Sequence, residues 1–265
     1  MRRRRPGDGD DRRTTELSTR PDIAALEVVA REVAAEWGLE LGPRFPLARH
    51  GFVAPAGEDA VLKVTPAVYR ETDLEPNALA HWNGDGAVRL LRHDGKRRAF
   101  LLERAQPGTD LAGLPDDEAT AIAVAVGLRL WRHADGPFPW IGDHVPAWLD
   151  EEPNELTSFA RDLFASLEVG RTTLVHGDFH HQNILDAGDR YVAIDPQPFL
   201  GEPEFDVPPW LWNPLPCRLR VDLLESRLAA FAAAGLDEER IRIWTVIRGA
   251  YLQPQEAEAL SLLVS

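Results

Sequence analysis

The sequence predicts an α+β protein built of two lobes, the first small and β-rich and the second larger and mainly helical. Short apolar runs separated by turn residues follow one another between residues 45 and 102, as in strands joined by tight turns. From residue 115 onward, apolar side chains recur instead at helical spacing over longer segments. An extended connection at residues 103–108 separates the two patterns. A chain of 265 residues is long enough to bury a substantial core.

The expected first lobe covers residues 19–105 and follows a basic tail. Residues 1–18 mix Arg, Asp, Gly and Thr without periodicity, which predicts disorder. A helix is then expected from Pro21 to Trp37, with Gly38 as its C-terminal cap. A second helix is expected over residues 71–82. The expected strands of this lobe are residues 52–54, 60–64, 88–91 and 99–102.

The expected second lobe covers residues 106–265 and is mainly helical. Its expected helices are residues 115–133, 154–167 (with Asn154 as N-cap), 218–233 and 237–252. An antiparallel hairpin and then a Pro- and Trp-rich loop at 196–216 lie between the second and third of these helices. Trp210 and Trp212 in that loop are expected in the core of the lobe, with stacking on a sugar or a cation as the alternative.

The charge and cysteine content limit the possible partners. A formal net charge of −14 argues against nucleic acid, whose binding needs clustered Lys and Arg. The same acidity would attract a cationic small molecule, or it serves solubility alone. The single cysteine, Cys217, rules out an internal disulfide and suits a reducing compartment. The longest apolar run, residues 119–130, is too short to cross a bilayer. We therefore expect a cytoplasmic protein without a nucleic-acid, membrane or obligate protein partner.

The most informative stretch is His176–Asp195, HGDFHHQNILDAGDRYVAID. Its two short apolar runs, at 183–185 and 191–194, predict a hairpin around a turn of Ala, Gly, Asp and Arg. An antiparallel hairpin would return Asn183 and Asp195 to the same open end, beside the loop that carries Asp178. Two oxygen ligands and a further carboxylate at one place suit Mg²⁺ and a phosphate substrate. The alternative is a polar loop beside an ordinary hairpin.

Lys63 is the second unusual residue, because it is one of only two lysines in the chain and lies inside an apolar run. A lysine in such a strand is unfavourable unless its charge is paired. Glu71 and Glu75 of the following helix are the candidate partners. The alternative is that Lys63 lies at a sheet edge and faces water.

Three segments of the chain match motifs of a known family. The first segment is Val61-Leu62-Lys63-Val64 together with EPNALAHWNGDGAVRLL from Glu75. The second is LERA from Leu102, with Pro107-Gly108 after it. The third runs from HGD at His176 through Asn183 and includes IDP from Ile194 and GEPEFD from Gly201. Together they resemble the aminoglycoside phosphotransferases, and within them the streptomycin 6-kinase and hydroxyurea phosphotransferase branch. The resemblance covers roughly residues 40–215 and implies a bilobal protein-kinase-like fold.

The resemblance implies catalytic roles for the residues of the third segment. Asp178 is similar to the family's catalytic base, which accepts or orients the proton of the attacking hydroxyl. Asn183 and Asp195 are similar to the Mg²⁺ ligands. His176 is similar to a histidine that fixes the catalytic loop.

The resemblance also implies an ATP site. Lys63 is similar to the lysine that contacts the α- and β-phosphates, paired with Glu75 or, as second choice, Glu71. The hinge, whose backbone would bind adenine, is implied at Glu103, Arg104 and Ala105. ATP and Mg²⁺ are the cofactors implied.

Three departures separate the chain from the protein kinases. No Gly-rich loop precedes Lys63, Gly177 replaces the arginine before the catalytic aspartate, and Pro196 rather than Phe-Gly follows the metal aspartate. The missing arginine is the one that answers a phosphorylated activation loop, so no such switch is expected. The departures favour a small-molecule kinase.

The acceptor site is expected at acidic residues of the second lobe. The first candidates are Glu202, Glu204 and Asp206, just after the metal loop, and further candidates are Asp150, Glu151 and Glu152. For Asp206 the alternative is a structural role, in which it ties its loop to the catalytic loop.

The function expected from the resemblance is ATP-dependent phosphorylation of a hydroxyl of a streptomycin-like aminoglycoside, and thereby antibiotic inactivation. The small acceptor would be cationic or hydroxylated. One alternative keeps the chemistry but uses hydroxyurea or a secondary-metabolite intermediate as acceptor. Another is a non-catalytic nucleotide-binding pseudokinase, which would be indicated by loss of Lys63, Asp178, Asn183 or Asp195, yet all four are present.

Overall fold

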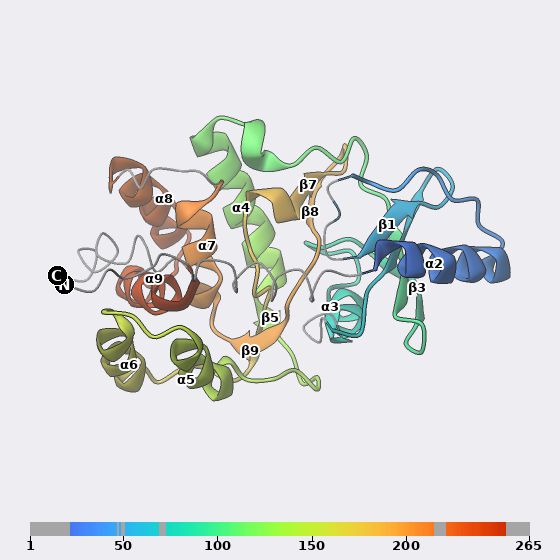
Figure 1. The fold of residues 1–265 in the computed structure, drawn as a ribbon. Coiled ribbons are helices and arrows are strands. Elements are labelled where there is room, and N and C mark those ends of the chain that lie inside the picture. The colour runs from blue at the N-terminus through green and yellow to red at the C-terminus, as the bar shows by residue number, and fades with distance from the viewer. Residues whose placement is uncertain (1–21, 47, 49–50, 69–72, 215–220, 253–265) are drawn as a thin grey trace, which may run out of the picture. The chain divides into compact units, whose positions relative to one another are not determined.

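The computed structural model describes residues 22–46, 48, 51–68, 73–214 and 221–252 (Figure 1). The chain divides into two compact units. The first consists of Met1–Asp73 and Leu91–Glu103, and the second of Leu74–Leu90 and Arg104–Ser265. The expected tail at 1–18, Glu71 and Cys217 lie outside the described residues.

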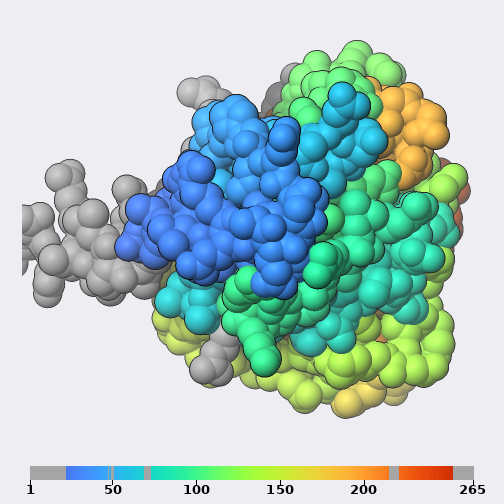
Figure 2. Space-filling model, turned by 90° about the vertical axis from the view of Figure 1, so that its right-hand side faces the viewer, coloured from blue at the N-terminus to red at the C-terminus, as the bar shows by residue number. Residues whose placement is uncertain are grey.

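The first unit is a four-stranded sheet covered on one face by a helix. Its strands are β1 (Phe52–Pro55), β2 (Ala60–Val64), β3 (Leu90–Asp94) and β4 (Ala99–Glu103), in the order β1-β2-β4-β3. Helix α2 (Ile23–Trp37) begins where the Asp22 side chain accepts a hydrogen bond from the Ala25 N–H and ends at Gly38, whose φ is 70°. Small and branched side chains of α2, among them Ala30 and Val33, pack on the sheet. Figure 2 shows α2, in blue, at the surface of this unit.

Residues 74–90 belong to the second unit, although the sequence placed them in the first lobe. Helix α3 (Glu75–Trp82) is fixed there because the Trp82 indole donates to the Leu130 carbonyl at 2.8 Å. The expected strand at 88–91 is divided between the units, since the Val88 N–H donates to the Ala193 carbonyl at 3.0 Å and β3 begins only at Leu90.

The second unit is mainly helical. Besides α3, its helices are α4 (Asp116–Leu130), α5 (Ile141–Glu151), α6 (Thr157–Ser166), α7 (Val207–Trp212), α8 (Val221–Ala233) and α9 (Glu238–Leu252). Its strands are β5 (Arg132–His133), β6 (Thr173–Val175), β7 (Ile184–Asp186), β8 (Tyr191–Ala193) and β9 (Phe199–Gly201). They form a three-stranded sheet, β5-β6-β9, and the hairpin β7-β8.

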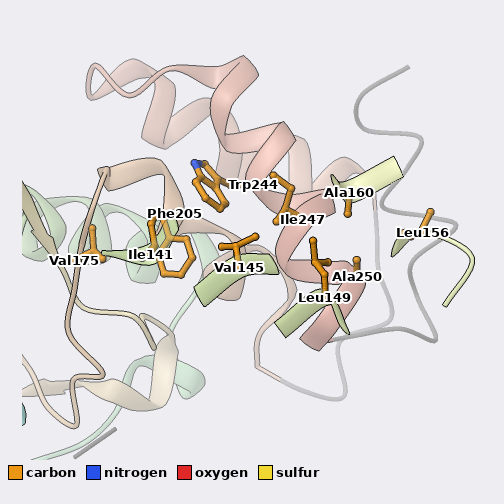
Figure 3. Close-up of a cluster of buried hydrophobic side chains, with 10 residues drawn as sticks. All are labelled: Ile141, Val145, Leu149, Leu156, Ala160, Val175, Phe205, Trp244, Ile247 and Ala250. Atoms are coloured by element: carbon orange, nitrogen blue, oxygen red, sulfur yellow. The ribbon is translucent and has the colours of Figure 1, made fainter. Parts of the chain in front are cut away.

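A hydrophobic core joins α5, α6 and α9 (Figure 3). Trp244 and Ile247 of α9 are completely buried, and Val145 of α5 and Ala160 of α6 pack against the same cluster. Phe205, from the short 3-10 helix Pro203–Phe205 before α7, enters this cluster with its ring edge-on to Trp244 at a centroid distance of 5.1 Å. The core thereby connects α9 to the segment that follows the hairpin.

The helix expected at 115–133 ends early, at Leu130. Residues 132–133 instead form β5, in which Arg132 pairs with Leu174 of β6. Trp131 follows directly after Leu130, and its indole N–H donates to Asp206 at 2.9 Å, a partner far away in the sequence.

Two helices were not predicted, and both contain proline. Helix α5 contains Pro146 in its interior, a position where proline is normally disfavoured. Helix α7 lies inside the expected loop at 196–216, and Pro208 stands in its first turn, where a missing N–H costs nothing. Helix α6 begins at Thr157 with Leu156, not Asn154, at its N-cap. None of the helices in the described part of the chain is both long and apolar enough to cross a membrane.

Candidate active site

The expected hairpin is present and brings Asn183 next to the position of Asp195. Strands β7 and β8 pair antiparallel, with Ile184 opposite Ala193. One further hydrogen bond, from the Ile194 N–H to the Asn183 carbonyl at 2.9 Å, extends the ladder. Asn183 itself ends a short 3-10 helix, His181–Asn183, rather than lying in the strand as expected. Asp195 follows directly after Ile194.

Asp178 and Asn183 are in direct contact. The Asn183 side-chain amide donates to the backbone carbonyl of Asp178 at 2.9 Å and to its carboxylate Oδ2 at 3.0 Å. These bonds use the amide nitrogen. The amide oxygen, Oδ1, is an acceptor and takes no part in them. The loop and the hairpin are thus joined through one asparagine that also has an oxygen to offer a cation.

Asp178 is held as a carboxylate. His180 Nε2 lies 3.4 Å from Asp178 Oδ2. Burial alone would raise the pKa of Asp178, but the contact with His180 and nearby positive charges outweigh burial and lower that pKa below its usual value. The group is therefore an ionised acceptor at neutral pH, as a base must be.

His176 fixes the loop from inside. It is completely buried, its Nε2 lies 2.9 Å from the Ile194 carbonyl, and its Nδ1 accepts from the Asp178 N–H at 3.3 Å. Burial lowers the pKa of His176, so the ring is neutral with its proton on Nε2. One imidazole therefore joins the loop to the end of the hairpin strand. The Trp82 ring stacks near it, at a centroid distance of 6.2 Å.

Gly177 has no room for a side chain. Its φ is +83°, and an added Cβ would lie 1.9 Å from the Gln197 carbonyl oxygen. The neighbouring backbone is fixed by a hydrogen bond from the Gln197 N–H to the His176 carbonyl at 2.8 Å. The glycine that stands in place of the protein-kinase arginine is thus required by the close approach of two loops.

Asp195 also has an unusual backbone conformation. Its φ is +60°, in the left-handed region that non-glycine residues seldom adopt. The residue is exposed. Such conformations persist where the surrounding structure imposes them, and they gather at functional sites.

Asp206 ties its own segment to the loop that carries Asp178. Its Oδ2 accepts from the His176 N–H at 2.6 Å and its Oδ1 from the Gly177 N–H at 2.7 Å. The Trp131 indole is a third donor, and Asp206 is completely buried. These contacts favour the structural role that was the alternative for this residue.

The other two acceptor candidates also face inward. Glu202 accepts hydrogen bonds from Arg240 Nε at 3.0 Å and Arg240 Nη2 at 2.6 Å, and a further one from the Trp244 indole at 2.6 Å. Glu204 accepts from the Asp237 N–H at 3.0 Å, at the start of α9. Both glutamates are less than a tenth exposed, which leaves little of either carboxylate to a bound molecule.

Arg248 is an anchor of the loop that the sequence did not indicate. From α9 it donates to the Gly177 carbonyl and to the Phe205 carbonyl, each at 2.8 Å. The available signal was an arginine inside an otherwise apolar stretch, next to Ile247.

His181 and Trp210 belong to the core beneath the loop. Their rings stack at 3.7 Å with an interplanar angle of 10°. Burial, helped by the charge of Arg227, lowers the pKa of His181 to about 3, so this histidine is neutral. The Trp210 indole donates to Thr120 at 3.2 Å, as expected for a core residue rather than a stacking surface.

The residues expected to bind the nucleotide lie in a strand, at a helix start and at a strand end. Lys63 lies opposite Val53 and Phe100 in the neighbouring strands and is only 7% exposed. Its neighbours Leu62 and Val64 belong to the cluster under α2. Because side chains alternate along a strand, Lys63 belongs to the opposite face of the sheet. Glu75 begins α3 and is 1% exposed. The expected hinge, residues 103–105, coincides with the end of β4 and the passage from the first unit to the second.

A magnesium ion fits the donors at the hairpin end. The described residues contain no cluster of three His, Cys, Asp or Glu side chains that could hold a metal by themselves. Mg²⁺ is typically bound by one or two protein oxygens, with water and substrate phosphates completing its shell. The Asn183 amide oxygen and the Asp195 carboxylate are donors of that kind.

The fold defines the class of protein. The structure is similar to the choline kinase LicA from Streptococcus pneumoniae, with a TM-score of 0.63 and 12% identity, covering 90% of this chain and 89% of that chain. This likeness confirms the α+β, protein-kinase-like fold expected from the sequence.

The chain belongs to the aminoglycoside/hydroxyurea antibiotic resistance kinase family, whose profile matches residues 50–253. It is 33% identical to a streptomycin 6-kinase of Streptomyces glaucescens over an alignment of 255 residues that covers 84% of this chain and 80% of the relative. It is 35% identical to a hydroxyurea phosphotransferase of Kitasatospora aureofaciens over an alignment of 246 residues that covers 82% of this chain and 69% of the relative. The family predicted from the three motif segments is thus confirmed.

Proposed function

We propose that the protein transfers the γ-phosphate of ATP to a hydroxyl group of a streptomycin-like aminoglycoside and thereby inactivates the antibiotic. The observation that carries this proposal is the Asp178–Asn183 pair at the end of the hairpin, in a chain one third identical to a streptomycin 6-kinase. Nucleotide binding is supported by the similar fold of LicA, which has been crystallised with AMP. Such a reaction needs intracellular ATP, so we propose a cytoplasmic location.

Asp178 would receive the acceptor hydroxyl. Its carboxylate is ionised at neutral pH, and one of its oxygens is oriented by the Asn183 amide. A carboxylate held in this way can align the hydroxyl and take its proton as the bond to phosphorus forms. Positioning of this kind supplies much of the rate in phosphoryl transfer.

Asn183 and Asp195 would hold Mg²⁺. The ion, when bound, neutralises charge on the phosphates. Asp195 has a left-handed backbone, with a φ of +60°, and follows directly after Ile194, where the strand ladder ends.

Lys63 and Glu75 would serve the nucleotide. Their roles follow from the motif resemblance, in which the lysine meets the α- and β-phosphates and the helix glutamate holds the lysine in place. Both are charged residues at low exposure, 7% and 1%. The backbone of Glu103, Arg104 and Ala105 would bind adenine.

We expect the acceptor to be held by residues other than Glu202, Glu204 and Asp206, because their carboxylates already accept internal hydrogen bonds. Glu151 and Glu152, at the end of α5, are exposed and remain candidates for cationic groups of the drug.

Hydroxyurea is the second candidate acceptor, supported by the 35% identity to a hydroxyurea phosphotransferase. Purified protein would be incubated with Mg-ATP and either streptomycin, other aminoglycosides or hydroxyurea, and the products analysed by mass spectrometry. We expect streptomycin to gain one phosphoryl group. Phosphorylation of hydroxyurea alone would select the second candidate, and no phosphorylated product together with intact ATP binding would favour a pseudokinase.

A further inference from the structure

Arg248 is a buried cation whose hydrogen bonds go to backbone carbonyls rather than to a carboxylate. It is 4% exposed in α9, and its guanidinium carbon lies 4.2 Å from the centre of the Phe205 ring. Nη1 donates to the Phe205 carbonyl and Nη2 to the Gly177 carbonyl, both at 2.8 Å. A buried guanidinium is costly unless it is hydrogen-bonded, and these two carbonyls supply such bonds.

The two peptide groups of Gly177 are held by opposite charges. Its N–H donates to Asp206 Oδ1 at 2.7 Å, and its carbonyl accepts from Arg248. Glycine is the residue with the greatest backbone freedom, and this one has a φ of +83°. Asp206 and Arg248 together remove that freedom immediately before the catalytic loop reaches Asp178.

The peptide group that joins Gly177 to Asp178 is fixed at both of its polar atoms. Arg248 binds its carbonyl oxygen, and His176 Nδ1 accepts its N–H at 3.3 Å. Because a peptide group is planar, its orientation determines where the next Cα and Cβ are directed. The direction of the Asp178 side chain therefore depends on both contacts.

Arg248 also connects this peptide group to the segment that carries Asp206. It binds the carbonyl of Phe205, and the Phe205–Asp206 peptide bond follows directly. One guanidinium thus holds the catalytic loop and its anchoring loop at a fixed separation.

We infer that Arg248 is a positioning residue, which orients the Gly177–Asp178 peptide group so that the Asp178 carboxylate is aligned for phosphoryl transfer. This inference rests on the proposed function through the role of Asp178. It predicts that loss of the guanidinium reduces turnover much more than it reduces substrate binding, because neither contact of Arg248 involves a substrate.

The test compares Arg248→Met with Arg227→Met. Arg227, on α8, is 2% exposed and donates to the carbonyls of Trp210 and Leu211 at 2.7 and 2.9 Å, so it is another buried arginine that caps backbone carbonyls. It differs from Arg248 in that it also forms an ion pair with Asp116, so its loss should cost at least as much stability. Both variants leave buried carbonyls unpaired and should lower the Tm. A displacement on the order of 1 Å at the reacting group costs about 100-fold in rate, so kcat per folded enzyme should fall roughly 10- to 100-fold in Arg248→Met. It should stay within about twofold of wild type in Arg227→Met, and KM should change little in either.

Arg248→Lys provides a variant that keeps the charge. Its ammonium keeps a donor for one of the two carbonyls that Arg248 binds, so kcat should recover in part. If Arg248→Met keeps the kcat of Arg227→Met, or raises KM at constant kcat, the positioning role is wrong.

Hydrogen exchange keeps the test independent of turnover. In Arg248→Met the amides of residues 176–178 should exchange faster than in Arg227→Met, and equal exchange in the two variants would overturn the inference. If wild-type protein phosphorylates no acceptor, the proposed function fails, whereas the exchange comparison still decides on the contact itself.

Discussion

Replacing Gly177 with alanine should inactivate the protein by displacing the catalytic loop. The added Cβ would lie 1.9 Å from the Gln197 carbonyl oxygen, and real Cβ atoms essentially never approach closer than 3.0 Å. The two backbones must therefore separate by about 1.1 Å. Neither can yield by a side-chain rotation, because the clash is with a carbonyl.

The expected magnitudes follow from this geometry. Alanine at a φ of +83° costs about 1 kcal/mol, and overpacking a fixed site costs a further 1–3 kcal/mol, so the free energy of unfolding should fall by about 2–4 kcal/mol. A shift of about 1 Å next to Asp178 should lower kcat by roughly 100-fold. Urea denaturation gives the first quantity, and a coupled ADP-release assay with the preferred acceptor gives the second.

Gly235→Ala is the matched control. Gly235 lies in the same unit with a φ of +101°, and nothing lies within 4 Å of its added Cβ. It should lose about 1 kcal/mol of stability and no activity. If Gly177→Ala retains a kcat within about threefold of this control, the close approach of the loops does not position Asp178.

Two further predictions concern buried polar side chains. His181 stays neutral to about pH 3 when folded, whereas the unfolded chain is protonated near the ordinary histidine pKa of 6.5. Lowering the pH through this window therefore favours unfolding, by up to about 1.4 kcal/mol per pH unit, and His181→Phe should weaken that dependence in metal-free urea titrations at pH 5 and 7. An unchanged pH dependence would show that the ring is not buried as a neutral group. Glu202→Gln should lower the free energy of unfolding by about 1–2 kcal/mol, because it weakens the bonds from the half-buried Arg240, while KM for the acceptor stays constant. A large rise in KM, absent from Glu151→Gln, would place Glu202 at the acceptor after all.

Local patterns in the sequence predicted the parts of the site that are local in the fold. The hairpin follows from two short apolar runs around a turn, and its register, Ile184 opposite Ala193, brings Asn183 to the end of the ladder beside Ile194. The contact of Asn183 with Asp178, five residues away, depends on the same short stretch.

Contacts between residues far apart in the sequence were not predictable in the same way. Glu202 appeared available for a substrate because nothing near it in the sequence indicates Arg240, 38 residues later. Arg248 reaches back 71 residues to Gly177. At the early end of α4, Trp131 likewise bonds to Asp206, 75 residues away. A polar side chain in a chain segment looks the same whether its partner is a substrate or a distant loop.

The most direct measurement of the central claim is the turnover of Asp178→Asn with Mg-ATP and the acceptor. Asparagine keeps the shape of the side chain but cannot accept the proton, so we expect kcat to fall by about 10²- to 10⁴-fold with nucleotide binding intact. Asp189→Asn, at the exposed tip of the same hairpin, should match wild type. If Asp178→Asn retains more than about a tenth of wild-type turnover, Asp178 is not the base and the proposed chemistry is wrong.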